Sequence, residues 1–216
     1  MRIEDLDVMP YREAWTLQEK VHAEVAEGGE ERILLVEHPP VITLGRRAEL
    51  ALQHLKVDEA HLKKIGVELV HSDRGGDITF HGPGQIVAYP IIRLNDHKLS
   101  VGGYVRRLQE CMIDALSKLG VIATTEENCV GIWVDRNGVL AKVCAIGVRI
   151  RRGVTMHGLA LNVEPDLNYY DLIVPCGIDC KPVTSLHQLL HHQAPSMAAV
   201  KAVVGQTLLH GLSGTS

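Results

Sequence analysis

The pattern that most limits how this chain can fold is the stretch of residues 74–85, which holds four glycines and one proline in twelve positions. Glycine tolerates positive φ and lets a backbone approach a ligand closely, while Pro83 fixes φ and removes a donor. The stretch therefore favours a shaped loop over a helix interior, and such a loop can wall a pocket. A glycine-rich connection between two strands, without a ligand, is the alternative interpretation.

Helices are predicted where apolar residues recur at three- and four-residue steps. Ser100 is placed to cap the most regular of these stretches, and Gly120 to end it. Gly28 ends the first helix and Asp58 caps a short one. The predicted helices cover residues 11–25, 58–66, 101–119, 186–190 and 197–209.

Strands are predicted from short β-favouring runs, and Asn137-Gly138 between two such runs is a strong hairpin signal. The predicted strands cover residues 33–36, 41–44, 67–70, 86–92, 132–134, 139–150 and 154–163. Hairpins imply antiparallel pairing, and the strands outnumber the helices. We therefore expect an α+β fold with a mixed, largely antiparallel sheet that carries its helices on one face.

Size and charge narrow the class of protein. A chain of 216 residues fits one domain, which we take as residues 1–216. A net charge of -4 argues against a general nucleic-acid binder, and no apolar run reaches membrane-spanning length. The N-terminus lacks the apolar core of a signal peptide, and five cysteines suit a reducing compartment. We expect a cytoplasmic protein that binds neither nucleic acid nor membrane.

Lys142 is the only charged residue in the β-favouring run of residues 139–148. Strand alternation predicts that it shares a face with Leu140, Cys144 and Ile146. Burying an unpaired ammonium is unfavourable, so this face opens onto a cleft or an anionic group meets the amine. The alternative is an edge position from which the amine reaches water.

Cys176 follows an apolar run and lies between Pro175 and Gly177, which indicates a shaped turn able to present a thiol. A lone cysteine in this context is more often a buried packing residue. Its thiolate would be a nucleophile if a cation such as Lys142 lay nearby. The other cysteines, Cys111, Cys129, Cys144 and Cys180, are interpreted as packing residues or left open, and no set of four ligands indicates a metal site.

The glycine-rich stretch resembles a family signature, the Arg-Gly-Gly-x-x-Thr-aromatic-His-Gly-Pro-Gly-Gln loop of octanoyltransferases, also called lipoate-protein ligase B. Matches also occur at residues 37–45, 142–149 with the following His157-Gly158, and 175–178. They keep the same order from about Tyr11 to about Leu186. Cys144 departs from the pattern, where we expect alanine or serine.

The resemblance implies the fold of biotin and lipoate protein ligases and an acyltransferase activity. The octanoyl group would move from octanoyl-acyl carrier protein to a lysine of apo lipoyl domains, in 2-oxoacid dehydrogenase E2 subunits and the glycine cleavage H protein. It also implies that Cys176 forms an acyl-thioester and that Lys142 lowers the pKa of its thiol. No cofactor and no metal are implied.

The resemblance further implies which residues bind substrate. They are Arg74, Gly75, Gly76, Asp77, Ile78, Thr79, Phe80, His81, Ala145, Ile146, Gly147, Gly158, Leu159 and Ala160. His81 would be a pocket wall, and His157 an auxiliary residue beside the pocket whose part in proton transfer stays open. Backbone amides around Gly75, Gly76 and Gly147 are candidate oxyanion donors.

Two alternatives remain at this stage. One is an ATP-dependent lipoate ligase of the same fold, although the sequence has no Walker A pattern and no Gly-x-Gly-x-x-Gly after a strand. The other is a non-catalytic module that binds fatty-acyl groups or lipoyl domains. The sequence gives neither acyl-chain length nor oligomeric state, because both depend on surfaces that form only on folding.

Overall fold

The computed structural model describes residues 1–46, 51–127, 129–174 and 182–213. Its elements are β1 (Arg2–Val8), α1 (Tyr11–Ala26), β2 (Arg32–Glu37), β3 (Val41–Leu44), α3 (Glu59–Lys64), β4 (Glu68–His71), β5 (Ile78–His81), β6 (Gln85–Ile91), α4 (Val101–Lys118), β7 (Gly131–Arg136), β8 (Val139–Arg151), β9 (Val154–Asn162), η1 (Leu167–Leu172), α5 (Leu186–Leu190), η3 (His191–Gln193) and α6 (Met197–Ser213). Among these residues, no helix combines the length and apolar character needed to cross a bilayer.

The helices arise where the sequence predicts them. The side chains of Asp58 and Ser100 accept hydrogen bonds from the amides of His61 and Gly103, so α3 and α4 begin at capped positions. Asn137 and Gly138 both have positive φ, which is the conformation that joins β7 and β8 in a tight hairpin. These predictions are confirmed. The first strand, β1, was not predicted.

The sheets confirm the predicted mixed, largely antiparallel α+β class. The larger sheet has the order β1-β2-β6-β9-β8-β7, in which only β1 and β2 pair in parallel. A smaller sheet has the order β4-β3-β5. It includes residues 78–81, so the middle of the stretch predicted as a loop is a strand, because Ile78 and Phe80 have apolar neighbours to pack against.

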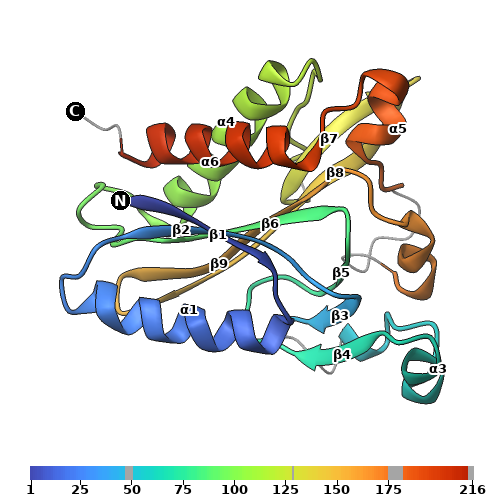
Figure 1. Ribbon diagram of the computed structural model, residues 1–216, viewed down its shortest axis with the longest axis horizontal. Helices are drawn as coiled ribbons and strands as arrows, with labels where there is room; N and C mark the ends of the chain where they lie inside the picture. Colours follow the sequence, from blue (N-terminus) through green and yellow to red (C-terminus); the bar gives the residue numbers. More distant parts are fainter. Residues whose placement is uncertain (47–50, 128, 175–181, 214–216) are drawn as a thin grey trace.

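The prediction that helices cover one face of the sheet is wrong. Figure 1 shows α1 on one side of the larger sheet and α4 and α6 on the other. Along β2, Leu34 faces the core under α1, while Ile33 and Leu35 face the core under α4 and α6. A strand buried on both faces loses the alternation of apolar and polar residues, which is why β2 and β6 read as continuous apolar runs.

A glycine allows two neighbouring strands to approach at the centre of the larger sheet. A Cβ atom added at Gly158 on β9 would lie 2.0 Å from the carbonyl oxygen of Ala88 on β6. Both positions are backbone in a packed core, so neither atom can move away easily. The fold therefore requires glycine at this position.

We expect Gly158→Ala to lower the free energy of unfolding by about 1 to 3 kcal/mol, because it overpacks the sheet. Gly102→Ala on α4 is the matched control. A Cβ at Gly102 meets nothing closer than 3.6 Å, and alanine favours a helix by about 0.5 to 1 kcal/mol over glycine. Urea unfolding of both variants tests this. Equal stability of Gly158→Ala and the wild type would contradict the packing account.

Candidate functional site

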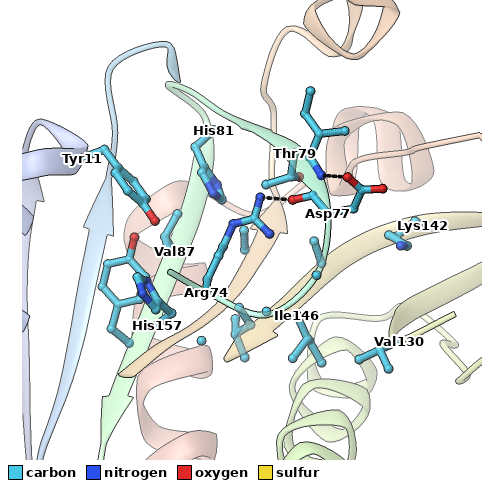
Figure 2. A pocket seen from close by; sticks show the side chains of 18 residues that line it. Tyr11, Arg74, Asp77, Thr79, His81, Val87, Val130, Lys142, Ile146 and His157 are labelled. Carbon is cyan, nitrogen blue, oxygen red and sulfur yellow. Dashed lines mark hydrogen bonds between the residues drawn. The ribbon is translucent and has the colours of Figure 1, made fainter. Parts of the chain in front are cut away.

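A cavity of about 540 Å³, including its open side, lies where the glycine-rich stretch meets the larger sheet (Figure 2). The wall residues come from α1, the glycine-rich stretch, strands of both sheets and the segment just before β7. They are Tyr11, Arg74, Gly76, Asp77, Ile78, Thr79, His81, Val87, Tyr89, Val130, Lys142, Ala145, Ile146, Gly147, His157, Gly158, Leu159 and Ala160. Segments far apart in the sequence therefore share one wall.

The cavity has an open side and a closed end. Val130 is 51% exposed and Gly76 is also exposed, whereas Tyr11, Tyr89 and His157 are at most 3% exposed. Figure 2 places Lys142 and Val130 opposite Tyr11 and His157. A ligand entering beside Lys142 would extend inward toward buried rings.

Most of the substrate-binding residues that the resemblance implies line this cavity, but two do not. Phe80 points into a separate apolar cluster, where it stacks on Tyr169 with ring centroids 4.6 Å apart. The amide of Gly75 donates to the carbonyl of Val148 over 2.9 Å. That amide is already used and is not an oxyanion donor, which corrects the prediction for Gly75. Cys176 lies outside the described residues.

Arg74 holds the glycine-rich stretch in place. Its guanidinium is buried and donates to the carbonyl and the hydroxyl of Thr43 on β3, and to the carbonyls of Gly75 and Asp77. Hydrogen bonds from a charged group are stronger than neutral ones. Arg74 thus lines the cavity, and its hydrogen bonds fix the part of the glycine-rich stretch that forms the cavity wall.

Lys142 is not at a sheet edge, so the interpretation in which its amine reaches water is wrong. The residue is 7% exposed, and it pairs with Trp133 on β7 and, on its other side, with the segment at Val183. Its Nζ donates to the Cys129 sulfur over 3.3 Å and lies 4.7 Å from the centroid of the Trp133 ring. A soft sulfur and an aromatic face therefore surround a buried amine.

Cys144 does not share the face of Lys142, contrary to the prediction from alternation. The register between β7 and β8 shifts between Ile132 and Trp133, so that Val143 has no partner in the pairing. This bulge leaves Lys142 in the cavity and Cys144 in the core under α4 and α6. Burial raises the pKa of the Cys144 thiol to about 12, which makes it a poor nucleophile.

Several residues of the site were missed from the sequence. Tyr11, Val87, Tyr89 and Val130 line the cavity, and Cys129 contacts the amine of Lys142. None of them carries a local signal. Tyr11, Val87 and Tyr89 follow ordinary helical or strand patterns, and Cys129 and Val130 precede β7. Only the packing of distant segments brings these residues to the cavity.

His157 is anchored by Asp73. Its Nε2 donates to the Asp73 carboxylate over 2.7 Å, and Arg149 pairs with the other oxygen of that carboxylate. Burial, with the charges of Arg74 and Arg149, lowers the pKa of His157 to about 3. His157 is therefore neutral near pH 7.

Two further histidines are also neutral: His81, which lines the cavity, and His38, which lies behind the lining. Burial lowers the pKa of His38 to about 4, and burial with the neighbouring His38 lowers that of His81 to about 3. His38 donates from Nδ1 to the carbonyl of Met9 and accepts the Tyr89 hydroxyl at Nε2. Neutral imidazoles line an apolar cavity without the large desolvation penalty of a charge.

Known sequences resemble this chain over nearly all of its length. Residues 10–209 match the lipoyl protein ligase A/B catalytic domain family. An octanoyltransferase of Bacteroides fragilis is 46% identical over 215 residues, which cover 96% of each chain. An octanoyltransferase of Chloroflexus aurantiacus is 49% identical over 197 residues, covering 90% of this chain and 86% of the relative.

Solved structures share the fold at low sequence identity. A putative lipoate protein ligase of T. acidophilum with bound lipoic acid has a TM-score of 0.78 at 18% identity, covering 98% of this chain and 86% of its own. The biotin protein ligase of Aquifex aeolicus has a TM-score of 0.54 at 10% identity, covering 99% of this chain and 69% of its own. The predicted ligase-like fold is confirmed.

The lowered pKa values of His38 and His81 predict a loss of stability in mild acid. The unfolded chain takes up protons below about pH 6.5, the ordinary histidine value, while the folded protein does not until about pH 4 or 3. The free energy of unfolding should therefore fall as pH falls through this window, by up to about 1.4 kcal/mol per pH unit for each group. His38→Gln should show a shallower decline. Parallel urea-denaturation profiles between pH 7 and pH 5 would contradict this.

Proposed function

The chain belongs to the octanoyltransferase family within the lipoyl protein ligase A/B catalytic domains and transfers octanoyl groups in protein lipoylation; we propose that it does so in two steps through an acyl-enzyme. The donor is octanoyl-acyl carrier protein. The acceptors are the apo lipoyl domains of 2-oxoacid dehydrogenase E2 subunits and the glycine cleavage H protein. Cys176 carries the acyl group between donor and acceptor.

The observation that supports this proposal most is the position of Lys142. Its amine lies beside the open side of a cavity whose other end is closed by buried rings. Apolar residues, including Ile146 and Leu159, line much of the space between. A fatty-acyl chain fits such a cavity with its carbonyl near the amine and its methyl end at the rings.

In the first step the Cys176 thiolate attacks the carbonyl carbon of the donor thioester. The bond between that carbon and the carrier sulfur breaks, and the carrier leaves as a thiol after taking up a proton. One thioester replaces another, so the step is nearly balanced in free energy. Lys142 stabilises the thiolate of Cys176 and is the source of the proton.

In the second step the neutral ε-amine of the acceptor lysine attacks the acyl-enzyme. The carbon–sulfur bond to Cys176 breaks, an amide forms, and the proton lost by the amine returns to the enzyme. The closed end of the cavity holds the chain while the acceptor approaches from the open side. No nucleotide is needed, because the donor is already activated as a thioester.

Cys176 should carry the acyl group when the acceptor is absent. Intact-mass measurement after incubation with octanoyl-acyl carrier protein, without nucleotide, should show one octanoyl adduct that hydroxylamine removes. Cys176→Ala should lose the adduct, and Cys111→Ala, at a buried packing position on α4, should retain it. Cys129 is the serious competitor because of its contact with Lys142. An adduct mapped to Cys129 would overturn the assignment.

Lys142→Ala should lower transfer by about a hundredfold or more, the usual effect of removing an acid–base group, while the protein stays folded. Lys142→Arg should restore activity only in part, since arginine keeps the charge but does not exchange a proton readily. Lys63→Ala, an exposed lysine on α3, is the matched control. Turnover of Lys142→Ala within a few-fold of the control would rule out this role.

A further inference from the structure

The closed end of the cavity is a wall of four rings, which we call the ring wall: Tyr11, His81, Tyr89 and His157. Their exposed fractions lie between 1% and 6%. Tyr11 stacks on His81 with centroids 6.0 Å apart, and Tyr89 meets His157 edge to face at 6.3 Å. In Figure 2, three of these rings carry labels and lie at the end of the cavity away from Lys142.

Hydrogen bonds hold the two tyrosines of the wall. The Tyr11 hydroxyl lies 2.8 Å from the hydroxyl of Ser72. The Tyr89 hydroxyl lies 2.8 Å from Nε2 of His38, whose other nitrogen bonds to the carbonyl of Met9. Neither ring can rotate away without leaving a buried polar group unpaired, which costs about 1 to 3 kcal/mol.

The two histidines of the wall are held in the same way. His81 donates from Nδ1 to the side-chain oxygen of Gln85 over 2.6 Å. His157 donates from Nε2 to Asp73, which Arg149 also pairs with. These bonds fix the ring planes, and both imidazoles are neutral near pH 7. An alkyl chain end therefore meets fixed, uncharged rings.

We propose that the ring wall sets the length of acyl chain that this enzyme transfers, with Tyr89 as its principal residue; the inference rests on the proposed function. Tyr89 follows Val87 on the same face of β6, and both line the cavity. Val87 pairs with Ala160 on β9, which lines it too. In this proposal the acyl chain passes the side chains of Val87 and Ala160 and ends at the ring of Tyr89.

This placement predicts opposite shifts from two substitutions. Tyr89→Val removes the ring that closes the cavity, which makes the cavity deeper, and should favour longer acyl chains. Ala160→Val fills the space before the wall and should favour shorter ones. One methylene changes discrimination in an apolar pocket by about tenfold or more, so the change in preference is measurable.

The test measures kcat/KM with hexanoyl, octanoyl, decanoyl and dodecanoyl thioesters of acyl carrier protein. Tyr89→Val should raise the decanoyl-to-octanoyl ratio by about tenfold. Ala160→Val should raise the hexanoyl-to-octanoyl ratio. Leu108→Val on α4, in the core on the other face of the sheet, is the control for general loosening and should leave both ratios unchanged.

Equal losses with every donor in both variants would overturn the inference, since they would reflect damage to the fold without a change in length selection. If Tyr89→Val does not fold, Ala160→Val decides alone, because it deletes no buried hydrogen bond. Failure of the wild type with all four donors would refute the proposed function itself, and the ring wall with it. A wild type that prefers octanoyl, with variants that keep this preference, refutes the ring wall only.

Discussion

The buried guanidinium of Arg74 is the interaction on which the site depends. It ties the glycine-rich stretch to Thr43 of the smaller sheet and to the carbonyl of Asp77. The next residue, Gly75, donates its amide to Val148 of the larger sheet. The Arg74 guanidinium and the Gly75 amide together join the two sheets at the place where the cavity forms. Without the guanidinium, the glycine-rich stretch would lose the hydrogen bonds that hold it against the cavity.

A second constraint is that the closed end of a cavity for an alkyl chain must present uncharged groups, although two of the four rings in the ring wall are histidines. Burial resolves the conflict by lowering the pKa values of His81 and His157 to about 3, so that both are neutral. Their hydrogen bonds to Gln85 and Asp73 then leave ring surface toward the cavity. The same groups that give the wall its rigidity make it compatible with an apolar ligand.

The bulge in β8 separates two side chains that regular alternation would place together. Lys142 enters the cavity, where Trp133 and Cys129 contact its amine, and Cys144 enters the core. An amine over an aromatic face gains about 0.5 to 2 kcal/mol, which helps to keep it buried. The bulge therefore lets two nearby residues of β8 point to different places, Lys142 into the cavity and Cys144 into the core.

The sequence alone determined the helices, the hairpin at Asn137 and Gly138, the mixed sheet and, through its resemblance to a family, the octanoyltransferase activity. These depend on local patterns of apolar residues, caps and turns, which a single segment contains. Tertiary structure alone decided that helices cover both faces of the sheet, that Cys144 turns away from Lys142, and that Tyr11, Tyr89 and Cys129 belong to the site. The reason is physical: burial, register and contacts between distant strands are set by packing, and no stretch of sequence carries them by itself.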